Sequence, residues 1–157
     1  MTLRDATEAD LFWTRSAIDL SRLSPPSPTH YAVGAVVVGP AGNPMATGYT
    51  GETDPHFHAE EEALAKLAGR GFDLGAATLY TSLEPCTVRK SRPVSCTELI
   101  LASGIRRVVL ALREPLHFAD CTGVETLLGH GVQVVEIAAL GEAVRDINAH
   151  VMGMQTT

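Results

Sequence analysis

The sequence has no long apolar run, no basic excess and few cysteines, and these shortages remove whole classes of protein. No stretch approaches the roughly 20 apolar residues that a membrane helix needs, so no transmembrane segment is expected. The first ten residues are polar and acidic, without the basic and apolar regions of a signal peptide. We therefore expect a cytoplasmic protein with no membrane partner.

The charge balance argues against a nucleic-acid binder. The chain has 12 Lys and Arg against 18 Asp and Glu, a net charge of −6 at pH 7. Contact with a phosphate backbone needs a basic surface that displaces counterions. A small phosphorylated substrate remains compatible with this charge, because one or two local cations are enough to bind it.

The three cysteines, Cys86, Cys96 and Cys121, make an odd count. In a chain without an export signal, thiols serve more often as metal ligands, catalytic groups or core residues than in disulfides. The cysteines are therefore candidate metal ligands.

Hydrophobic periodicity predicts an α/β protein with one domain over residues 1–157. A first helix and a hairpin precede alternating strands and helices, an order typical of a mixed sheet covered by helices on both faces. Helices are expected over residues 8–22, 58–67, 96–103, 124–129 and 140–152, and strands over residues 33–38, 45–49, 77–82, 107–112 and 132–137.

One imidazole, two thiols and a carboxylate form the most informative group. His58, Cys86 and Cys96 offer the nitrogen and sulfur ligands that zinc prefers in a tetrahedron. Three protein ligands, rather than four, are typical of a catalytic zinc with an open position for water. Glu60 lies two residues after His58 at a helix start, where it can accept a proton from that water without binding the metal. Cys121 as a fourth ligand would instead indicate a closed, structural site.

The spacing matches a known signature in part. His58-Ala59-Glu60 and Pro85-Cys86 fit H-x-E…P-C-x-x-C, the signature of zinc nucleobase deaminases. Cys96, however, follows Cys86 after nine residues instead of two, which predicts a surface loop between the two ligands. That loop carries Arg89, Lys90 and Arg92, a basic cluster suited to a substrate phosphate. Glu84 is expected to cap the helix that follows it.

The region from residue 31 to residue 136 resembles the cytidine-deaminase-like superfamily, and within it the pyrimidine deaminase of riboflavin biosynthesis. The resemblance rests on six segments of the sequence: Val33-Gly34-Ala35-Val36-Val37-Val38, His58-Ala59-Glu60 with Ala63-Leu64, Leu83-Glu84-Pro85-Cys86, Cys96-Thr97-Glu98-Leu99-Ile100, Ala102-Ser103-Gly104-Ile105, and Glu114-Pro115 with Gly123. It implies a three-layer α/β/α fold with a central mixed sheet of about five strands, and a homodimer or homotetramer.

The resemblance also suggests residues that contact the substrate. The backbone from Thr81 to Leu83, which includes Ser82, would line the base pocket. Two departures from the family pattern bear on specificity: His30 stands approximately where the family has Asn before the first strand, and Leu116-His117 replaces Asn-Pro. His30 and His117 are therefore candidate substrate contacts.

These observations favour a Zn²⁺-dependent hydrolase that removes an exocyclic amino group from a heterocyclic base and releases ammonia. The first expectation is a phosphorylated pyrimidine, the diamino-hydroxy-phosphoribosylamino pyrimidine of riboflavin biosynthesis. Cytidine, deoxycytidylate or a purine or pterin base is the alternative substrate. A catalytically silent, zinc-stabilised binding module is the alternative outside enzymes, and Glu60 argues against it.

Overall fold

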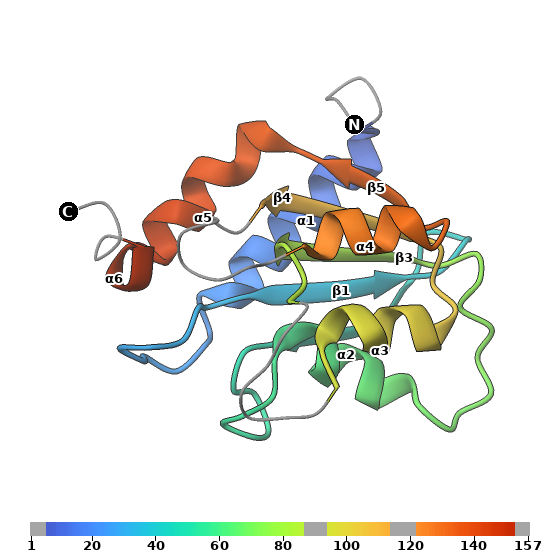
Figure 1. Ribbon diagram of the computed structural model, residues 1–157, viewed down its shortest axis with the longest axis horizontal. Helices are drawn as coiled ribbons and strands as arrows, with labels where there is room; N and C mark the ends of the chain where they lie inside the picture. Colours follow the sequence, from blue (N-terminus) through green and yellow to red (C-terminus); the bar gives the residue numbers. More distant parts are fainter. Residues whose placement is uncertain (1–5, 87–93, 114–121, 153–157) are drawn as a thin grey trace.

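The computed structural model describes residues 6–86, 94–113 and 122–152. These residues form a central sheet flanked by helices (Figure 1). The elements in chain order are α1 (Glu8–Ser21), β1 (Gly34–Val38), β2 (Pro44–Tyr49), α2 (Ala59–Leu67), β3 (Thr78–Leu83), α3 (Cys96–Ser103), β4 (Arg107–Leu112), α4 (Gly123–Gly129), β5 (Gln133–Glu136), a 3-10 turn (Ala138–Leu140), α5 (Gly141–Ile147) and α6 (Ala149–Met152).

The sheet is mixed and has the strand order β2-β1-β3-β4-β5. Strand β1 runs antiparallel to both β2 and β3, whereas β3, β4 and β5 run parallel to one another. Strand β3 therefore lies at the centre, and its carboxyl end leads directly to Cys86. The expected mixed sheet of about five strands is confirmed.

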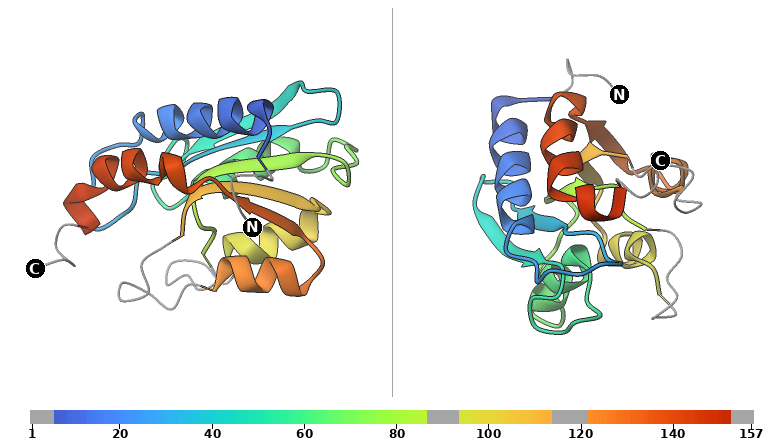
Figure 2. Two further views of the ribbon diagram at one scale, coloured as in Figure 1. Left: turned by 90° about the horizontal axis from the view of Figure 1, so that it is seen from above. Right: turned by 90° about the vertical axis from the view of Figure 1, so that its left-hand side faces the viewer.

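The alternation of side chains along the strands divides the core into two layers. Ala35 and Val37 of β1 belong to the cluster that packs against α2, α3 and α4, while Val36 and Val38 belong to the cluster beneath α1. All five residues of β1 are buried because helices cover both faces of the sheet. Figure 2 shows α1 and α5 on one side of the sheet and α3 and α4 on the other. The three-layer α/β/α arrangement is thus confirmed.

Two glycines allow helices to approach the hairpin closely. A Cβ at Gly34 would lie 1.9 Å from the Ala17 carbonyl oxygen of α1, and a Cβ at Gly48 would lie 2.4 Å from the Ala59 carbonyl oxygen of α2. Because these contacts are with backbone, any larger residue would push the helix away. The close contact at Gly48 fixes the first turn of α2, where His58 and Glu60 lie.

The expected closing helix over residues 140–152 is wrong in one respect: it is broken at Asn148. The buried Asn148 side chain accepts a hydrogen bond from Ala32 N at 2.7 Å and donates to the Ala32 and Val144 carbonyl oxygens at 3.1 Å. These bonds tie the end of α5 to the segment before β1, and the chain restarts as α6. A long-range polar contact of this kind leaves no periodic signal in the sequence.

Among the described residues, no helix is both long enough and apolar enough to cross a bilayer.

Candidate metal centre

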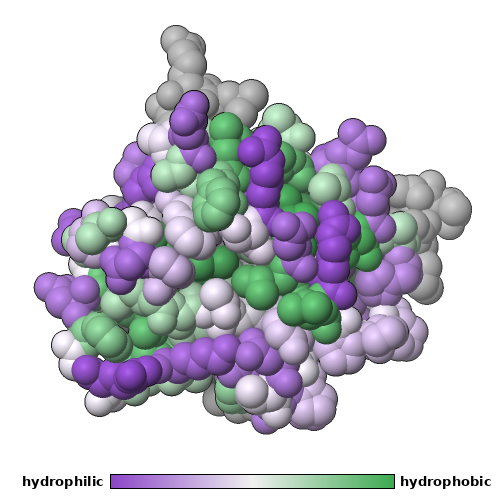
Figure 3. Space-filling view, turned by 180° about the vertical axis from the view of Figure 1, so that it is seen from behind, coloured by the Kyte–Doolittle hydropathy of each residue, from purple (hydrophilic) through white to green (hydrophobic). Residues whose placement is uncertain are grey.

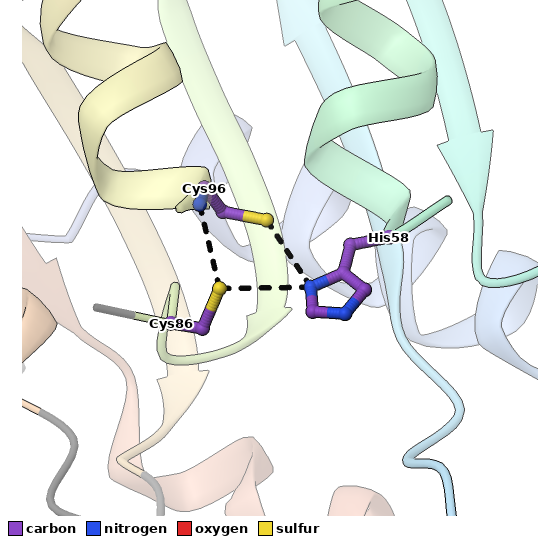
Figure 4. Close-up of side chains that lie close together, drawn as sticks. All are labelled: His58, Cys86 and Cys96. Carbon is purple, nitrogen blue, oxygen red and sulfur yellow. Dashed lines mark hydrogen bonds between the residues drawn. The ribbon is translucent and has the colours of Figure 1, made fainter. Parts of the chain in front are cut away.

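Three side chains from separate elements converge at the carboxyl end of β3. His58 precedes the first residue of α2, Cys86 follows β3, and Cys96 is the first residue of α3. Figure 4 shows the His58 ring pointing toward both sulfur atoms. The His58 Nδ1 atom lies 3.6 Å from Cys86 Sγ and 3.3 Å from Cys96 Sγ. The three ligand atoms all lie within 4.8 Å of one another.

These distances fit a tetrahedral zinc. Zinc–sulfur bonds of about 2.3 Å and zinc–nitrogen bonds of about 2.0–2.1 Å, at tetrahedral angles, place nitrogen and sulfur roughly 3.5 Å apart. Both cysteines are free thiols, so neither sulfur is consumed in a disulfide. Within the described part of the chain, the group contains these three donors, which is the ligand number of a catalytic rather than a structural site.

Hydrogen bonds between the Cys86 loop and the first turn of α3 bring the two thiols together. Cys96 N donates to Cys86 Sγ at 3.3 Å, and Thr97 donates to the Cys86 carbonyl oxygen through both its backbone N, at 3.1 Å, and its hydroxyl, at 2.6 Å. Ser95 caps α3, and its Oγ accepts from Glu98 N. The helix therefore begins at the second cysteine despite the long interval after Cys86.

The environment favours the Cys86 thiolate, which is the form that binds metal. A hydrogen bond from the Cys96 side chain lowers the pKa of Cys86, burial opposes this effect, and a hydrogen bond and charge from His58 add to it, so that the pKa is about 4. The Cys86 sulfur is therefore suited to binding a divalent cation.

Glu60 is buried beside the three donors, with 3% of its surface exposed. Burial raises the pKa of Glu60 to about 7; the charge of His58 and a hydrogen bond from Thr81 oppose the rise, and the charge of Cys86 adds to it. A carboxyl group with a pKa near neutrality can both accept and donate a proton.

Thr81 is a site residue whose side chain the sequence did not reveal. Its Oγ1 lies 3.2 Å from Glu60 Oε2 and 3.1 Å from the Leu83 carbonyl oxygen, and the residue is fully buried. It holds one oxygen of the Glu60 carboxyl. One signal in the sequence could have indicated this role. Thr81 is a hydroxyl residue close to the Pro85-Cys86 motif, in a strand whose two faces pack against apolar layers.

The predicted substrate contacts are dispersed. Ser82 is buried and accepts a hydrogen bond from Gly34 N at 3.1 Å, so its side chain joins β3 to β1. Leu83 is 3% exposed and packs in a core cluster with Ile18. His30 lies before β1, where its Nδ1 is 3.0 Å from Ser27 Oγ and its carbonyl oxygen accepts from His150. It lines a pocket of about 390 Å³ between the end of α1 and α6. These contacts join His30, Ser82 and Leu83 to neighbouring parts of the fold rather than to the metal donors.

The remaining predicted residues lie outside the described part of the chain. They are Arg89, Lys90 and Arg92 of the basic loop, His117, and Cys121.

The expected role of Glu84 as a cap for the next helix is wrong. Ser95 caps α3, and Glu84 Oε2 instead accepts a hydrogen bond from Val124 N in α4, at 2.9 Å. The parallel pairing of β3 with β4 brings the two segments together, although they are 40 residues apart in sequence.

Comparison with protein families gives one match over residues 7–112, to the model described as the cytidine and deoxycytidylate deaminase zinc-binding region. The match covers more than half of the chain and includes His58, Cys86 and Cys96. It confirms zinc as the metal expected from the sequence.

Several similar proteins are named for a more specific activity. A diaminohydroxyphosphoribosylamino-pyrimidine deaminase of Schizosaccharomyces pombe is 38% identical over 76% of this chain and 30% of its own length. A protein of the same name from Buchnera aphidicola is 35% identical over 80% of this chain and 82% of its own. A Thermotoga maritima structure, a diaminohydroxyphosphoribosylaminopyrimidine deaminase and reductase, has a TM-score of 0.75 at 33% identity, over 93% of this chain and 42% of that one.

The chain spans about a third of the length of the first curated relatives that it matches, from 30% to 38%. The Buchnera protein, in contrast, is matched over most of its length.

Proposed function

The chain belongs to the zinc-binding cytidine and deoxycytidylate deaminase family, and we propose that it is a hydrolytic deaminase of a phosphorylated pyrimidine. The proposed substrate is the diamino-hydroxy-phosphoribosylamino pyrimidine of riboflavin biosynthesis. One observation carries the activity: the buried carboxyl of Glu60 lies beside a histidine and two thiols that converge with zinc-like spacing.

We assign His58 Nδ1, Cys86 Sγ and Cys96 Sγ as the zinc ligands. A zinc ion in such a site acts as a Lewis acid that makes water nucleophilic at neutral pH. The first turn of α2 holds Glu60 at this position, and Thr81 orients one of its oxygens.

Glu60 moves the protons of the reaction. Its carboxylate accepts a proton from the attacking water and delivers it to the ring nitrogen beside the carbon under attack. It then transfers the second proton of that water to the departing amino group. The C–N bond breaks, ammonia leaves, and a carbonyl oxygen remains on the ring. Water and amine are converted to carbonyl and ammonia, without any redox partner.

Two observations support a phosphorylated substrate. Relatives matched at 35–38% identity are named for a phosphoribosylamino pyrimidine. The loop between the two cysteines carries Arg89, Lys90 and Arg92 in a chain whose net charge is −6. Guanidinium groups bind phosphate oxygens in bidentate fashion.

We also propose one catalytic domain over residues 1–157 and a homodimer or homotetramer. Phe12 of α1 and Leu23 just after it are 59% and 60% exposed. The face that carries α1 shows apolar patches among hydrophilic residues (Figure 3).

We also propose a cytoplasmic location, because thiol ligands favour a reducing compartment.

An ammonia-release screen tests the function directly. The zinc-loaded protein is incubated with the riboflavin pyrimidine intermediate, its dephosphorylated form, cytidine, deoxycytidylate, cytosine, guanine and a pterin. We expect the highest kcat/KM with the phosphorylated pyrimidine intermediate. Preference for a free base or nucleoside would overturn the substrate assignment, and no ammonia from any compound would favour a silent zinc-stabilised module.

Cysteine substitutions test the ligand assignment. Cys96→Ala should lose bound zinc by elemental analysis, because two donors remain. Cys121→Ala is the matched control, and it should retain zinc. If Cys96→Ala kept a full equivalent, Cys96 would not be a ligand; loss of zinc in Cys121→Ala would place Cys121 in the site.

A further inference from the structure

We propose that Glu84 and Gly123 are positioning residues that fix the Cys86 ligand through contacts with β4 and α4, in addition to the contacts that α3 makes. The inference rests on the metal site proposed above and is independent of the substrate. Cys96 and Thr97 of α3 hold the Cys86 loop on one side. The contacts on the other side come from β4 and α4, which contain none of the proposed metal ligands.

The first contact is a buried hydrogen bond. Glu84 is 4% exposed, and its Oε2 accepts from Val124 N at 2.9 Å. The Glu84 backbone N also donates to the Leu112 carbonyl oxygen at 2.9 Å, where β4 ends. Both bonds involve Glu84, two residues before Cys86. They tie the segment between β3 and this ligand to both β4 and α4.

The second contact is a steric fit that only glycine permits. A Cβ added to Gly123 would lie 2.2 Å from the Pro85 carbonyl oxygen and 3.3 Å from Glu84 Cγ. The Pro85 oxygen belongs to the backbone and cannot rotate away. Gly123 is buried, and its Cα fills the space directly against the peptide that joins Pro85 to Cys86.

Together these contacts hold the Pro85–Cys86 peptide between two helix entrances. On one side the Thr97 hydroxyl lies 2.6 Å from the Cys86 carbonyl oxygen, and on the other Gly123 packs against the Pro85 carbonyl oxygen. A shift of α4 would therefore displace a metal ligand. Mutation of groups that orient metal ligands in this way typically lowers metal affinity 10- to 100-fold.

The test compares zinc affinity, measured by competition with a chromophoric chelator, in matched variants of the full chain. Gly123→Ala should lower the affinity by about 10- to 100-fold. Gly129→Ala lies in the same helix, has no atom within 4 Å of its added Cβ, and should bind zinc as the wild type does. After cobalt substitution, the sulfur-to-metal charge-transfer bands should be altered in Gly123→Ala but not in Gly129→Ala.

A second pair of variants covers the case in which Gly123→Ala fails to fold. Glu84→Leu removes the acceptor for Val124 N and should weaken zinc binding, whereas Glu84→Gln retains an acceptor oxygen and should recover most of the affinity. Tyr80→Phe removes a hydrogen bond to Asp10 on the α1 side of the sheet, and it serves as a control for general destabilisation.

The inference is overturned if Gly123→Ala and Glu84→Leu fold and bind zinc as tightly as the wild type, or if Tyr80→Phe weakens binding equally. Neither outcome affects the deaminase proposal. That proposal fails separately, if the zinc-loaded wild type releases no ammonia.

Discussion

Two buried carboxyl groups, Glu60 and Asp10, lie in opposite electrostatic environments within the same small fold. Both side chains are almost inaccessible to water, at 3% and 1% exposure. Burial alone would raise the pKa of each, because it disfavours the charged form. The pKa of Glu60 is raised to about 7, but that of Asp10 is lowered to about 2.

The partners of each group account for the difference. Arg107 donates to both oxygens of Asp10, at 2.8 and 2.7 Å, and the Tyr80 hydroxyl donates at 2.8 Å. The Thr7 backbone N, at the cap of α1, donates at 3.0 Å. These bonds and the Arg107 charge outweigh burial, which by itself raises the pKa of Asp10. Asp10 is therefore a fixed anion that joins α1 to β3 and β4.

Glu60 has no such set of partners among the interactions of the described residues. The Thr81 hydroxyl is its side-chain donor, and the charge of Cys86 opposes ionisation. A carboxyl held in this way can change its protonation state during a reaction, whereas Asp10 cannot do so near neutral pH. The comparison shows that cations and hydrogen-bond donors outweigh burial at Asp10 and keep it ionised, whereas burial prevails at Glu60 and leaves it available for proton transfer.

The largest expected effect is the loss of activity in Glu60→Gln. The amide keeps the size of the side chain but neither accepts nor delivers the proton, so kcat should fall by about 10²- to 10⁴-fold. Zinc content by elemental analysis should be unchanged. Glu142→Gln, the same substitution at an exposed position of α5, should be neutral. Normal turnover by Glu60→Gln would remove Glu60 from the mechanism.

The corresponding change at the other carboxyl should affect stability. Arg107→Leu leaves Asp10 buried without its cation, and we expect a loss of about 3 kcal/mol in the free energy of unfolding. Arg106→Leu, at the exposed neighbouring position, should change it by less than about 0.5 kcal/mol. Urea denaturation of both variants measures the difference. Equal stability of the two would mean that the ion pair contributes little.

Acid should weaken the Asp10 contacts within a defined pH range. The pKa of Asp10 is about 2 in the folded chain against 3.8 for the unperturbed group, so the unfolded chain binds more protons between these values. The stabilisation is therefore complete above about pH 4 and is lost as the pH falls toward 2, by about 2 kcal/mol. The stability gap between the wild type and Asp10→Asn, measured by denaturation at each pH, should narrow accordingly. A constant gap would contradict the assignment.

The smallest expected effect concerns the single hydroxyl beside Glu60. Thr81→Val keeps the shape of the side chain but removes its bond to the carboxyl, and we expect kcat to fall less than about tenfold, in keeping with one hydrogen bond. Thr81→Ser retains the hydroxyl and should preserve more of the rate. A loss as large as that of Glu60→Gln would mean that Thr81 takes part in proton transfer itself.

Much of this protein could be predicted from its residues alone. Local patterns located all five strands and the opening helix within one or two residues, because apolar alternation and glycine turns are short-range signals. His58-Ala59-Glu60 and Pro85-Cys86 carried the metal hypothesis and the family resemblance, because ligand chemistry depends on residue type. The acidic net charge argued against a nucleic-acid partner, and the basic loop indicated a small phosphorylated substrate.

Tertiary structure decided which distant residues meet. The parallel pairing of β3 with β4 gave Glu84 a partner 40 residues away, and the packing of α1 on the sheet placed Asp10 against Arg107, 97 residues away. Asn148 ended α5 because its amide bonds to Ala32 across the fold. The opposite pKa shifts of Glu60 and Asp10 have the same origin. Sequence specifies each carboxyl group, but only folding specifies the charges and hydrogen-bond donors that surround it.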